Sequence, residues 1–237
     1  DPITVMTREG NGSTTVRAVR IEAPLRIDGA LDEELYRRVA PLTGFIQIEP
    51  DDGSVASERT DVWLAFDHDN VYVSFRVWDS QMDRLVATEM RRDNGILWSG
   101  NDNVVFVFDT FNDRRSALSF TVNALGGRAD GQVINEKQFN PDWNPVWDLK
   151  TGRFEGGWTV EFAIPFKSLR YRSGSNQVWG FQARRSIRHK NEWAYLTPVP
   201  QNLAGPQGLN RISSGGTLVG LSGPGEGLCP KTALSRP

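Results

Sequence analysis

The sequence predicts an all-β fold, an antiparallel β-sandwich with jelly-roll or immunoglobulin-like layering and one or two short helices. Apolar residues recur at every second position in short runs, which is the period of a half-buried strand. The 237 residues include 23 Gly and 13 Pro beside 8 Trp and 12 Phe, a composition typical of short strands joined by many turns. Helical periodicity is brief, so the strands should follow one another as hairpins and form stacked antiparallel sheets.

The strands can be placed in order along the chain. An early strand is expected near residues 16–22, and the clearest alternation covers residues 59–66, which predicts one buried and one polar face. Residues 67–70 are all turn formers and alternation resumes over residues 71–78, so these two strands should form a β-hairpin. Further strands, each between Gly, Pro, Asn or Asp, are expected at residues 104–108, 117–123, 158–164 and 178–187.

Helical signals are short. Leu31, Leu35 and Val39 recur at a spacing of four and Pro41 ends the pattern, which predicts one short helix. A second helical turn is expected after Pro165.

Composition indicates one domain. We expect the sandwich to span residues 21–221, with an N-terminal extension over residues 1–20 and a Gly/Ser/Pro-rich flexible tail or linker over residues 222–237. The 27 basic and 29 acidic side chains give a net charge of -2, which argues against nucleic acid as a partner, and we expect a monomer. The single cysteine, Cys229, leaves no disulfide and no cysteine-based zinc site within the chain.

Catalytic motifs are sparse. His68 and His189 lie far apart without other ligands at metal spacing, which disfavours both a zinc enzyme and a Ser-His-Asp triad, and no glycine-rich loop indicates an organic cofactor. A glycoside hydrolase needs only two carboxylates, and Glu161, in the strand over residues 158–164, is a weak candidate acid. The alternative is an outward-facing or salt-bridged glutamate on a sheet.

Two turns carry oxygen ligands that could suit calcium. Asp67 and Asp69 lie in the hairpin turn, and Asp109 and Asp113 follow the strand over residues 104–108. Neither group has the spacing of an EF-hand loop, and Asp is also common in turns for conformational reasons. Structural calcium is therefore one of two interpretations.

A basic stretch covers residues 184–190 and contains three arginines, a histidine and a lysine. It could form a nucleic-acid patch with Trp193, but on a strand its charges would divide between two faces. We expect a solvated edge strand protected by charge.

Tryptophans suggest a carbohydrate site. Trp98, Trp143 and Trp147 lie in segments rich in Gly, Asn, Asp and Pro, while Trp63 and Trp78 fall on the polar faces of their strands. Indole rings presented by loops suit the apolar faces of pyranose rings, with polar side chains nearby for the hydroxyls. The alternative is that they cap the ends of the core.

Several motifs together resemble family 9 carbohydrate-binding modules, and the resemblance covers residues 21–221 in order and spacing. They are Ile-Asp-Gly-Ala-Leu-Asp-Glu at residues 27–33, residues 61–79 and 102–109, Phe-Thr-Val-Asn at residues 120–123, Gly-Trp-Thr-Val-Glu-Phe-Ala-Ile-Pro at residues 157–165, and residues 179–181 and 216–218. Residues 109–115, 164–171 and 188–192 are similar to an uncharacterised bacterial group in which the module begins a larger cell-envelope protein.

The resemblance implies a non-catalytic sugar-binding sandwich, often with structural calcium, attached to xylanases or other polysaccharide enzymes or to a membrane-anchored C-terminal region. It implies a secreted, periplasmic or outer-membrane-associated bacterial protein whose partner is a polysaccharide or oligosaccharide. Trp98 would stack on the sugar, and Asn101, Asp102 and Asn123 would serve as hydroxyl partners or structural residues.

Two polar anchors of the family pattern are replaced, a glutamate by Val105 and an arginine by Thr121. These departures favour a third hypothesis besides the binding module and the glycoside hydrolase. It is a structural or interaction domain that has lost sugar binding.

Overall fold

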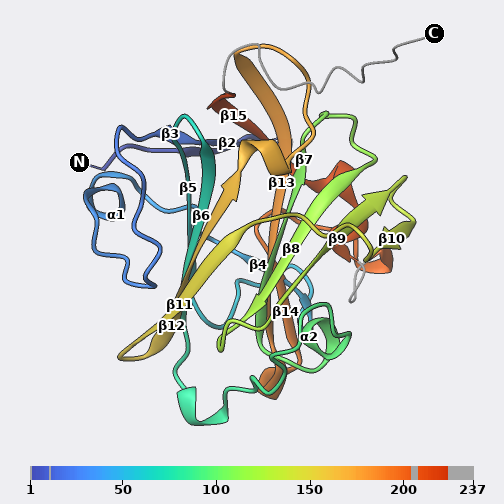
Figure 1. Ribbon diagram of the computed structural model, residues 1–237. Coiled ribbons are helices and arrows are strands. Elements are labelled where there is room, and N and C mark those ends of the chain that lie inside the picture. The colour runs from blue at the N-terminus through green and yellow to red at the C-terminus, as the bar shows by residue number, and fades with distance from the viewer. Residues whose placement is uncertain (1, 11, 204–207, 224–237) are drawn as a thin grey trace, which may run out of the picture.

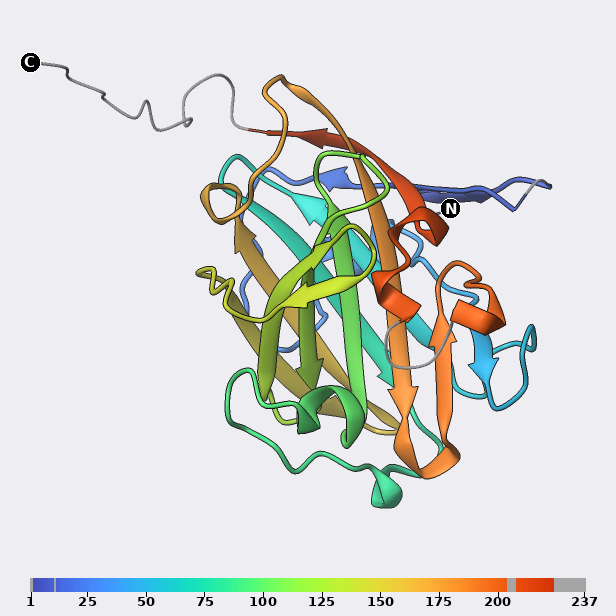
Figure 2. The same ribbon diagram turned by 90° about the vertical axis from the view of Figure 1, so that its right-hand side faces the viewer.

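The computed structural model describes residues 2–10, 12–203 and 208–223. Two β-sheets stack face to face, as Figures 1 and 2 show from two directions. The predicted fold class, a β-sandwich, is confirmed, and only short helices accompany the strands. In the described part of the chain, no helix is both long and apolar enough to cross a membrane.

The larger sheet has ten strands in the order β1-β2-β15-β13-β7-β8-β9-β10, with β14 and β4 attached beside β13. Their bounds are β1 (Met6–Arg8), β2 (Thr14–Arg17), β4 (Ile46–Glu49), β7 (Asn103–Asp109), β8 (Ala117–Asn123), β9 (Arg128–Ile134), β10 (Gln138–Asn140), β13 (Asn176–Ile187), β14 (Glu192–Tyr195) and β15 (Gly216–Ser222). Pairing is antiparallel except between β2 and β15.

The smaller sheet has five strands in the order β11-β12-β6-β5-β3. Their bounds are β3 (Val19–Arg20), β5 (Thr60–Phe66), β6 (Asn70–Trp78), β11 (Asp148–Phe154) and β12 (Gly157–Pro165). The predicted hairpin is confirmed as β5 and β6, and each predicted strand has a counterpart. The two α-helices, α1 (Glu34–Arg38) and α2 (Ile96–Ser99), lie outside the sandwich (Figure 1).

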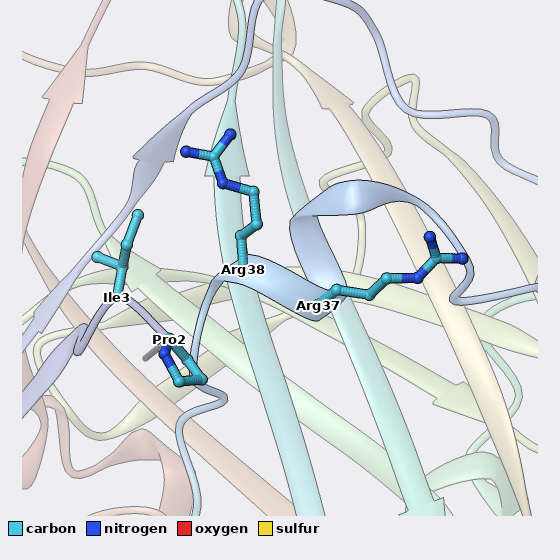
Figure 3. A pocket seen from close by; sticks show the side chains of 4 residues that line it. All are labelled: Pro2, Ile3, Arg37 and Arg38. Atoms are coloured by element: carbon cyan, nitrogen blue, oxygen red, sulfur yellow. The ribbon is translucent and has the colours of Figure 1, made fainter.

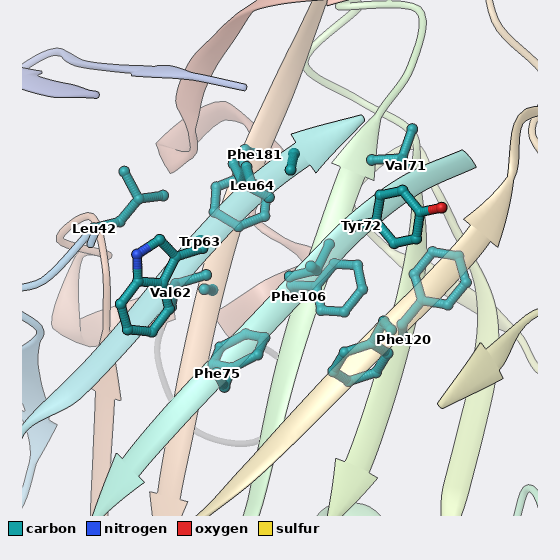
Figure 4. Close-up of a cluster of buried hydrophobic side chains, with 14 of the residues drawn as sticks. Leu42, Val62, Trp63, Leu64, Val71, Tyr72, Phe75, Phe106, Phe120 and Phe181 are labelled. Carbon is teal, nitrogen blue, oxygen red and sulfur yellow. The ribbon is translucent and has the colours of Figure 1, made fainter. Parts of the chain in front are cut away.

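Phenylalanine rings fill the space between the sheets (Figure 4). Phe106 of β7 stacks on Phe120 of β8 at 5.1 Å and meets Phe162 of β12 edge-on at 5.0 Å, so one ring joins both sheets. Burial of such large side chains is the main force that holds the layers together.

The prediction that the strand over residues 59–66 is half-buried was wrong, because both faces of β5 are buried. The segment around α1 covers the second face, where the Trp63 indole N–H donates to the Val39 carbonyl at 2.9 Å and Tyr36 meets the Trp63 ring at 5.3 Å. Trp63 is therefore a core residue, while Trp78 is half-buried against Phe154 at 4.8 Å.

The basic stretch also differs from its prediction. It ends β13, a central strand that pairs with β7, β14 and β15, and Arg184 and Arg185 are buried. The expected solvated edge was wrong because neighbouring strands and their connections cover both faces, which local sequence does not reveal.

Residues outside the expected sandwich limits contribute to it. Strands β2 and β3, in the part expected as an extension, pair with β15 and β5 and so join both sheets. The expected tail over residues 222–237 lies outside the described residues from residue 224 onward.

Candidate functional site

The candidate site lies on the outer face of the ten-stranded sheet, near α2. The pairing register places one row of neighbouring residues across five strands on this face: Tyr195, Arg184, Val105, Thr121 and Ala129. Val105 and Thr121 are the two positions at which the resemblance implies polar anchors. The register makes these two replaced positions direct cross-strand neighbours.

Trp98 stands at the edge of this face. It belongs to α2, is half-buried, and its indole N–H donates to the Thr121 hydroxyl at 2.9 Å. Its ring meets Phe139 of β10 edge-on at 5.6 Å. A Cβ at Gly131 would lie 2.3 Å from the Phe139 ring, so this glycine gives Phe139 the room to approach. The sequence analysis missed Phe139. Its only signal was Gly131, because a glycine inside a strand can indicate that another group approaches closely.

The middle of the face is closed. The guanidinium of Arg184 lies 4.5 Å from the Trp193 ring centroid and donates to the side-chain oxygen Oδ1 of Asn103 at 3.3 Å. Val105 is 1% exposed and packs in a second apolar cluster with Leu209 and Ile212. A ligand on this face would therefore meet the side chains near Trp98 first.

Asn101 and Asn123 hold the loop before α2. The Asn123 amide donates to the Glu89 carbonyl at 2.7 Å and to the Asn101 side-chain oxygen at 2.8 Å, and its oxygen accepts from the amides of residues 125 and 127. The Asn101 oxygen also accepts from the amides of residues 88 and 89. Both side chains are fully buried, and these contacts use all four hydrogen-bonding positions of Asn123.

Asp102 joins two loops. Its carboxylate accepts from the backbone amides of Val86 at 2.5 Å and Arg188 at 2.8 Å. Burial raises the pKa of the Asp102 carboxyl, and these two hydrogen bonds oppose the rise. Asp102 therefore positions the backbone on both sides of the site, which is the structural one of its two expected roles.

Trp143 and Trp147 close the open edge of the core. Trp147 is 4% exposed; Phe162 stacks on its ring at 5.7 Å and the Arg128 guanidinium lies 5.2 Å from its ring centroid. Its indole N–H donates to Asp130 at 3.0 Å, and the half-buried Trp143 packs against the same core. Both tryptophans lie in the loop between β10 and β11, and the sequence analysis also expected them in a loop. The Trp147 ring, however, caps the core and does not present an open face. Of the three loop tryptophans, only Trp98 lies at the edge of the outer sheet face.

Glu161 anchors the first motif of the chain. One of its oxygens accepts from the amides of Asp28 at 3.1 Å and Gly29 at 2.8 Å, and the other accepts from the Tyr36 hydroxyl at 2.7 Å. Gly29 has φ +85°, and a Cβ there would lie 2.7 Å from the Thr151 backbone, so glycine is required. Glu161 is fully buried under this loop, so the outward-facing alternative was wrong, and the carboxylate lacks the open position of a general acid.

This geometry explains why α1 is shorter than the expected helix around residues 31–39. Hydrogen bonds to Glu161 hold residues 28 and 29 in a turn, and backbone at Val39 is extended where it pairs with the N-terminal segment. The α-helix is therefore limited to residues 34–38.

Glu161→Gln should alter the pH dependence of stability. Burial raises the pKa of Glu161, so the folded state binds this proton more tightly than the unfolded state. The contribution of Glu161 to stability is complete below the ordinary pKa of 4.5 and is lost as pH rises through the higher folded value. The variant lacks this titrating group. As pH rises across this window, its free energy of unfolding, measured by urea titration, should therefore increase relative to that of the wild type. The exposed Glu155→Gln is the matched control, and a pH-independent difference for Glu161→Gln would contradict the argument.

The first expected calcium turn is satisfied by the protein itself. One Asp67 oxygen accepts from the amides of Asp69 and Asn70 at 2.7 Å, and the other accepts from the Tyr72 hydroxyl at 2.6 Å. Asp69 is exposed and pairs with His68 at 2.9 Å. These hydrogen bonds within the turn are a conformational reason for aspartate at position 67.

The second turn is similar. The Asp109 oxygens accept from the amides of Asp113 at 3.1 Å and Arg114 at 2.8 Å, and Asp113 in turn accepts from the amide of Ser116 at 2.8 Å. Across residues 2–10, 12–203 and 208–223, no group of three or more His, Cys, Asp or Glu side chains could hold a metal ion. Calcium takes six to eight oxygen ligands, and in both turns the aspartates also accept hydrogen bonds from the protein itself. Structural calcium stays a prediction.

The two stacked sheets form a β-sandwich, and together with the family match that follows they define the class of this protein as a carbohydrate-binding-type β-sandwich module. The family model described as "Carbohydrate family 9 binding domain-like" matches residues 27–191. The chain belongs to this family, as the motifs predicted. No curated protein sequence matches the chain.

Solved structures show the same fold. A family 9 carbohydrate binding module from Caldicellulosiruptor kristjanssonii in complex with cellotriose has a TM-score of 0.60 and 17% identity, with 86% of this chain and 92% of that chain covered. The module from the same organism in complex with glucose has a TM-score of 0.61 and 15% identity, with 91% and 100% covered. A Bacteroides uniformis protein has a TM-score of 0.66 and 11% identity, with 86% and 98% covered.

Proposed function

We propose that this module binds a glucose-based oligosaccharide at the aromatic edge near α2, with Trp98 as the stacking platform. The family membership and the cellotriose and glucose complexes of structurally similar modules support this proposal. The observation that carries it is the half-buried Trp98 ring, whose indole N–H is fixed by Thr121 while Phe139 supports its edge. A fixed ring loses little conformational freedom on binding, which favours stacking on a sugar.

Trp98→Ala should weaken binding of cellotriose by about 1–3 kcal/mol, because it removes an aromatic contact. Isothermal titration calorimetry with cellotriose and glucose measures this directly. Phe111→Ala is the matched control, since Phe111 is 42% exposed in the loop after β7 and belongs to no proposed site. Equal affinities of the Trp98→Ala variant and the wild type would remove Trp98 from the site.

A second candidate function is a structural or interaction domain without sugar binding. It is favoured by the closed middle of the sheet face, where Val105 is buried and the Thr121 hydroxyl is used by Trp98. Affinity electrophoresis against xylan, glucans, mannan and chitin separates the two candidates, because only the binding module is retarded.

The same samples test two further expectations, calcium binding and catalysis. Addition of calcium or a chelator tests the calcium prediction, and release of reducing sugar would revive the glycoside hydrolase hypothesis despite the burial of Glu161. Attachment to a larger polysaccharide-degrading or cell-envelope protein, and a secreted, periplasmic or outer-membrane location, stay predictions from the family resemblance.

A further inference from the structure

A hollow of about 350 Å³ beside α1 is lined by Pro2, Ile3, Arg37 and Arg38. Figure 3 shows that the two arginine side chains leave α1 in different directions. Arg38 is also engaged already, because it pairs with Glu34 at 3.3 Å. The described lining of this hollow therefore lacks the converging polar groups of a ligand site.

The chain directly before α2 carries a different kind of chemistry, because residues 94 and 95 are an Asn-Gly pair. In such a pair the backbone nitrogen of glycine can attack the side-chain carbonyl carbon of asparagine, since glycine has no Cβ to hinder the approach. Asn94 is the one asparagine followed by glycine among those that the structure describes. Residues 11–12 are also Asn-Gly, but Asn11 lies outside the described residues.

The local structure leaves both reacting groups available. Gly95 is exposed, and apart from its chain neighbours no described atom lies within 4 Å of the position that a Cβ on it would occupy. No described residue accepts a hydrogen bond from the Gly95 N–H. The Asn94 side-chain oxygen accepts from the Ile96 amide at 3.0 Å, which folds the side-chain carbonyl back over the Gly95 peptide and polarises it.

We propose that Asn94 converts without an enzyme into isoaspartate, and that this modification disables the stacking site, an effect that rests on the function proposed above. The Gly95 nitrogen, once its proton has left, forms a bond to Cγ of Asn94. The bond between Cγ and Nδ2 breaks, and the leaving ammonia takes up the proton. Water then opens the resulting succinimide ring. Cleavage at the backbone carbonyl gives isoaspartate, and cleavage at the former side-chain carbonyl gives aspartate.

Isoaspartate inserts a methylene group into the backbone between two fixed points. Before the modified residue, the Asp93 amide donates to the Arg128 carbonyl at 3.1 Å and the Asp93 carboxylate accepts from the Asp130 amide at 3.1 Å. Strand β9 therefore fixes this end. After the modified residue, the Trp98 indole N–H donates to a hydroxyl of β8 at 2.9 Å. The added length between these anchors must displace α2.

The hydrogen bonds that begin α2 depend on the same two residues. The Leu97 amide donates to the Asn94 carbonyl at 3.0 Å, and the Trp98 amide donates to the Gly95 carbonyl at 3.2 Å. In isoaspartate the first of these carbonyls leaves the main chain and becomes a carboxylate. Because α2 has only four residues, few other helical hydrogen bonds hold it, and the Trp98 ring should lose its fixed position.

Incubation at mildly alkaline pH followed by peptide mapping tests the chemical step. Every sample carries Asn11→Gln, so that residues 94 and 95 are the one Asn-Gly pair left. Isoaspartate should form at residue 94 and should be a substrate for protein isoaspartyl methyltransferase. Gly95→Ala should slow its formation at least about tenfold, because a Cβ hinders ring closure. Gly95 has φ -56° and ψ -24°, so alanine fits this backbone without strain.

The modified protein, separated by ion exchange and ¹⁵N-labelled, tests the effect on α2. Its amide signals should shift at Leu97 and Gly100 but not at Val62 of β5. Its affinity for cellotriose, measured by isothermal titration calorimetry, should fall to that of the Trp98→Ala variant. Freshly purified Asn94→Asp is the matched control, because it carries the charge of the product without the added methylene group, and it should bind cellotriose as the parent protein does.

Absence of isoaspartate at residue 94, or equal rates in the parent protein and in Gly95→Ala, overturns the modification. Isoaspartate that leaves the amide signals of α2 in place, or that leaves the affinity for cellotriose intact, overturns its effect on the stacking site. If cellotriose binds neither the unmodified nor the modified protein, the proposed function fails. The peptide map and the amide shifts then still decide whether residue 94 reacts and whether α2 moves.

Discussion

Phe106→Ala is expected to lower the free energy of unfolding by about 3–5 kcal/mol, the range for loss of a large aromatic side chain from a well-packed core. Phe106 is fully buried, and its ring contacts Phe120 in its own sheet and Phe162 in the opposite sheet. Strands on both sides are fixed by their hydrogen-bonded ladders, so the space cannot collapse and a cavity remains.

Equilibrium unfolding in guanidinium chloride, followed by tryptophan fluorescence, measures this loss. Phe111→Ala removes the same ring from an exposed loop and should change stability by less than about 0.5 kcal/mol. Phe106→Leu should fall between the two, because it retains part of the buried volume. A loss below about 1 kcal/mol for Phe106→Ala would show that the two sheets are not joined through this ring.

Local patterns predicted the parts of the fold that depend on neighbours in sequence. Alternation and the turn at residues 67–70 predicted β5 and β6, because a hairpin needs only a polar turn between two strands. Strand β9 was not predicted, since Asp130 and Gly131 interrupt its apolar pattern. Asp130 lies there because Arg92 and Trp147 bind its carboxylate at 2.7 and 3.0 Å, and both partners come from distant loops.

The candidate site, like the fold, could be predicted only where it depends on residue type and local sequence. Residue type and loop context singled out Trp98, which the structure places at the edge of the sheet face. The family resemblance grouped Asn123 with it, but the fold brings the Glu89 carbonyl and Asn101 onto the Asn123 amide. Which polar side chains remain open to a ligand depends on the path of the loop before α2, and sequence patterns do not determine that path.

Asp79→Ala is expected to lower the free energy of unfolding by about 3–5 kcal/mol, the range for removal of one partner from a buried ion pair. Asp79 and Arg185 are 2% and 3% exposed, and the Arg185 guanidinium lies 3.5 Å from the Asp79 carboxylate. The variant leaves a buried cation with hydrogen bonds only to the Arg59 carbonyl and the Thr60 hydroxyl, at 3.2 and 3.3 Å. Burial itself lowers the pKa of Arg185, and Asp79 is the largest influence against that fall.

A double-mutant cycle with Arg185→Met isolates this interaction from other effects of each substitution. The double variant should be more stable than Asp79→Ala alone, because no uncompensated buried charge remains and a Met side chain fills much of the same space. The exposed pair of Glu34 and Arg38, at 3.3 Å, provides the control, and Glu34→Ala should cost less than about 0.5 kcal/mol. If the two single substitutions simply add, the ion pair contributes nothing, and Asp79 stabilises the fold only through the hydrogen bond that it accepts from the Gln81 amide at 2.9 Å.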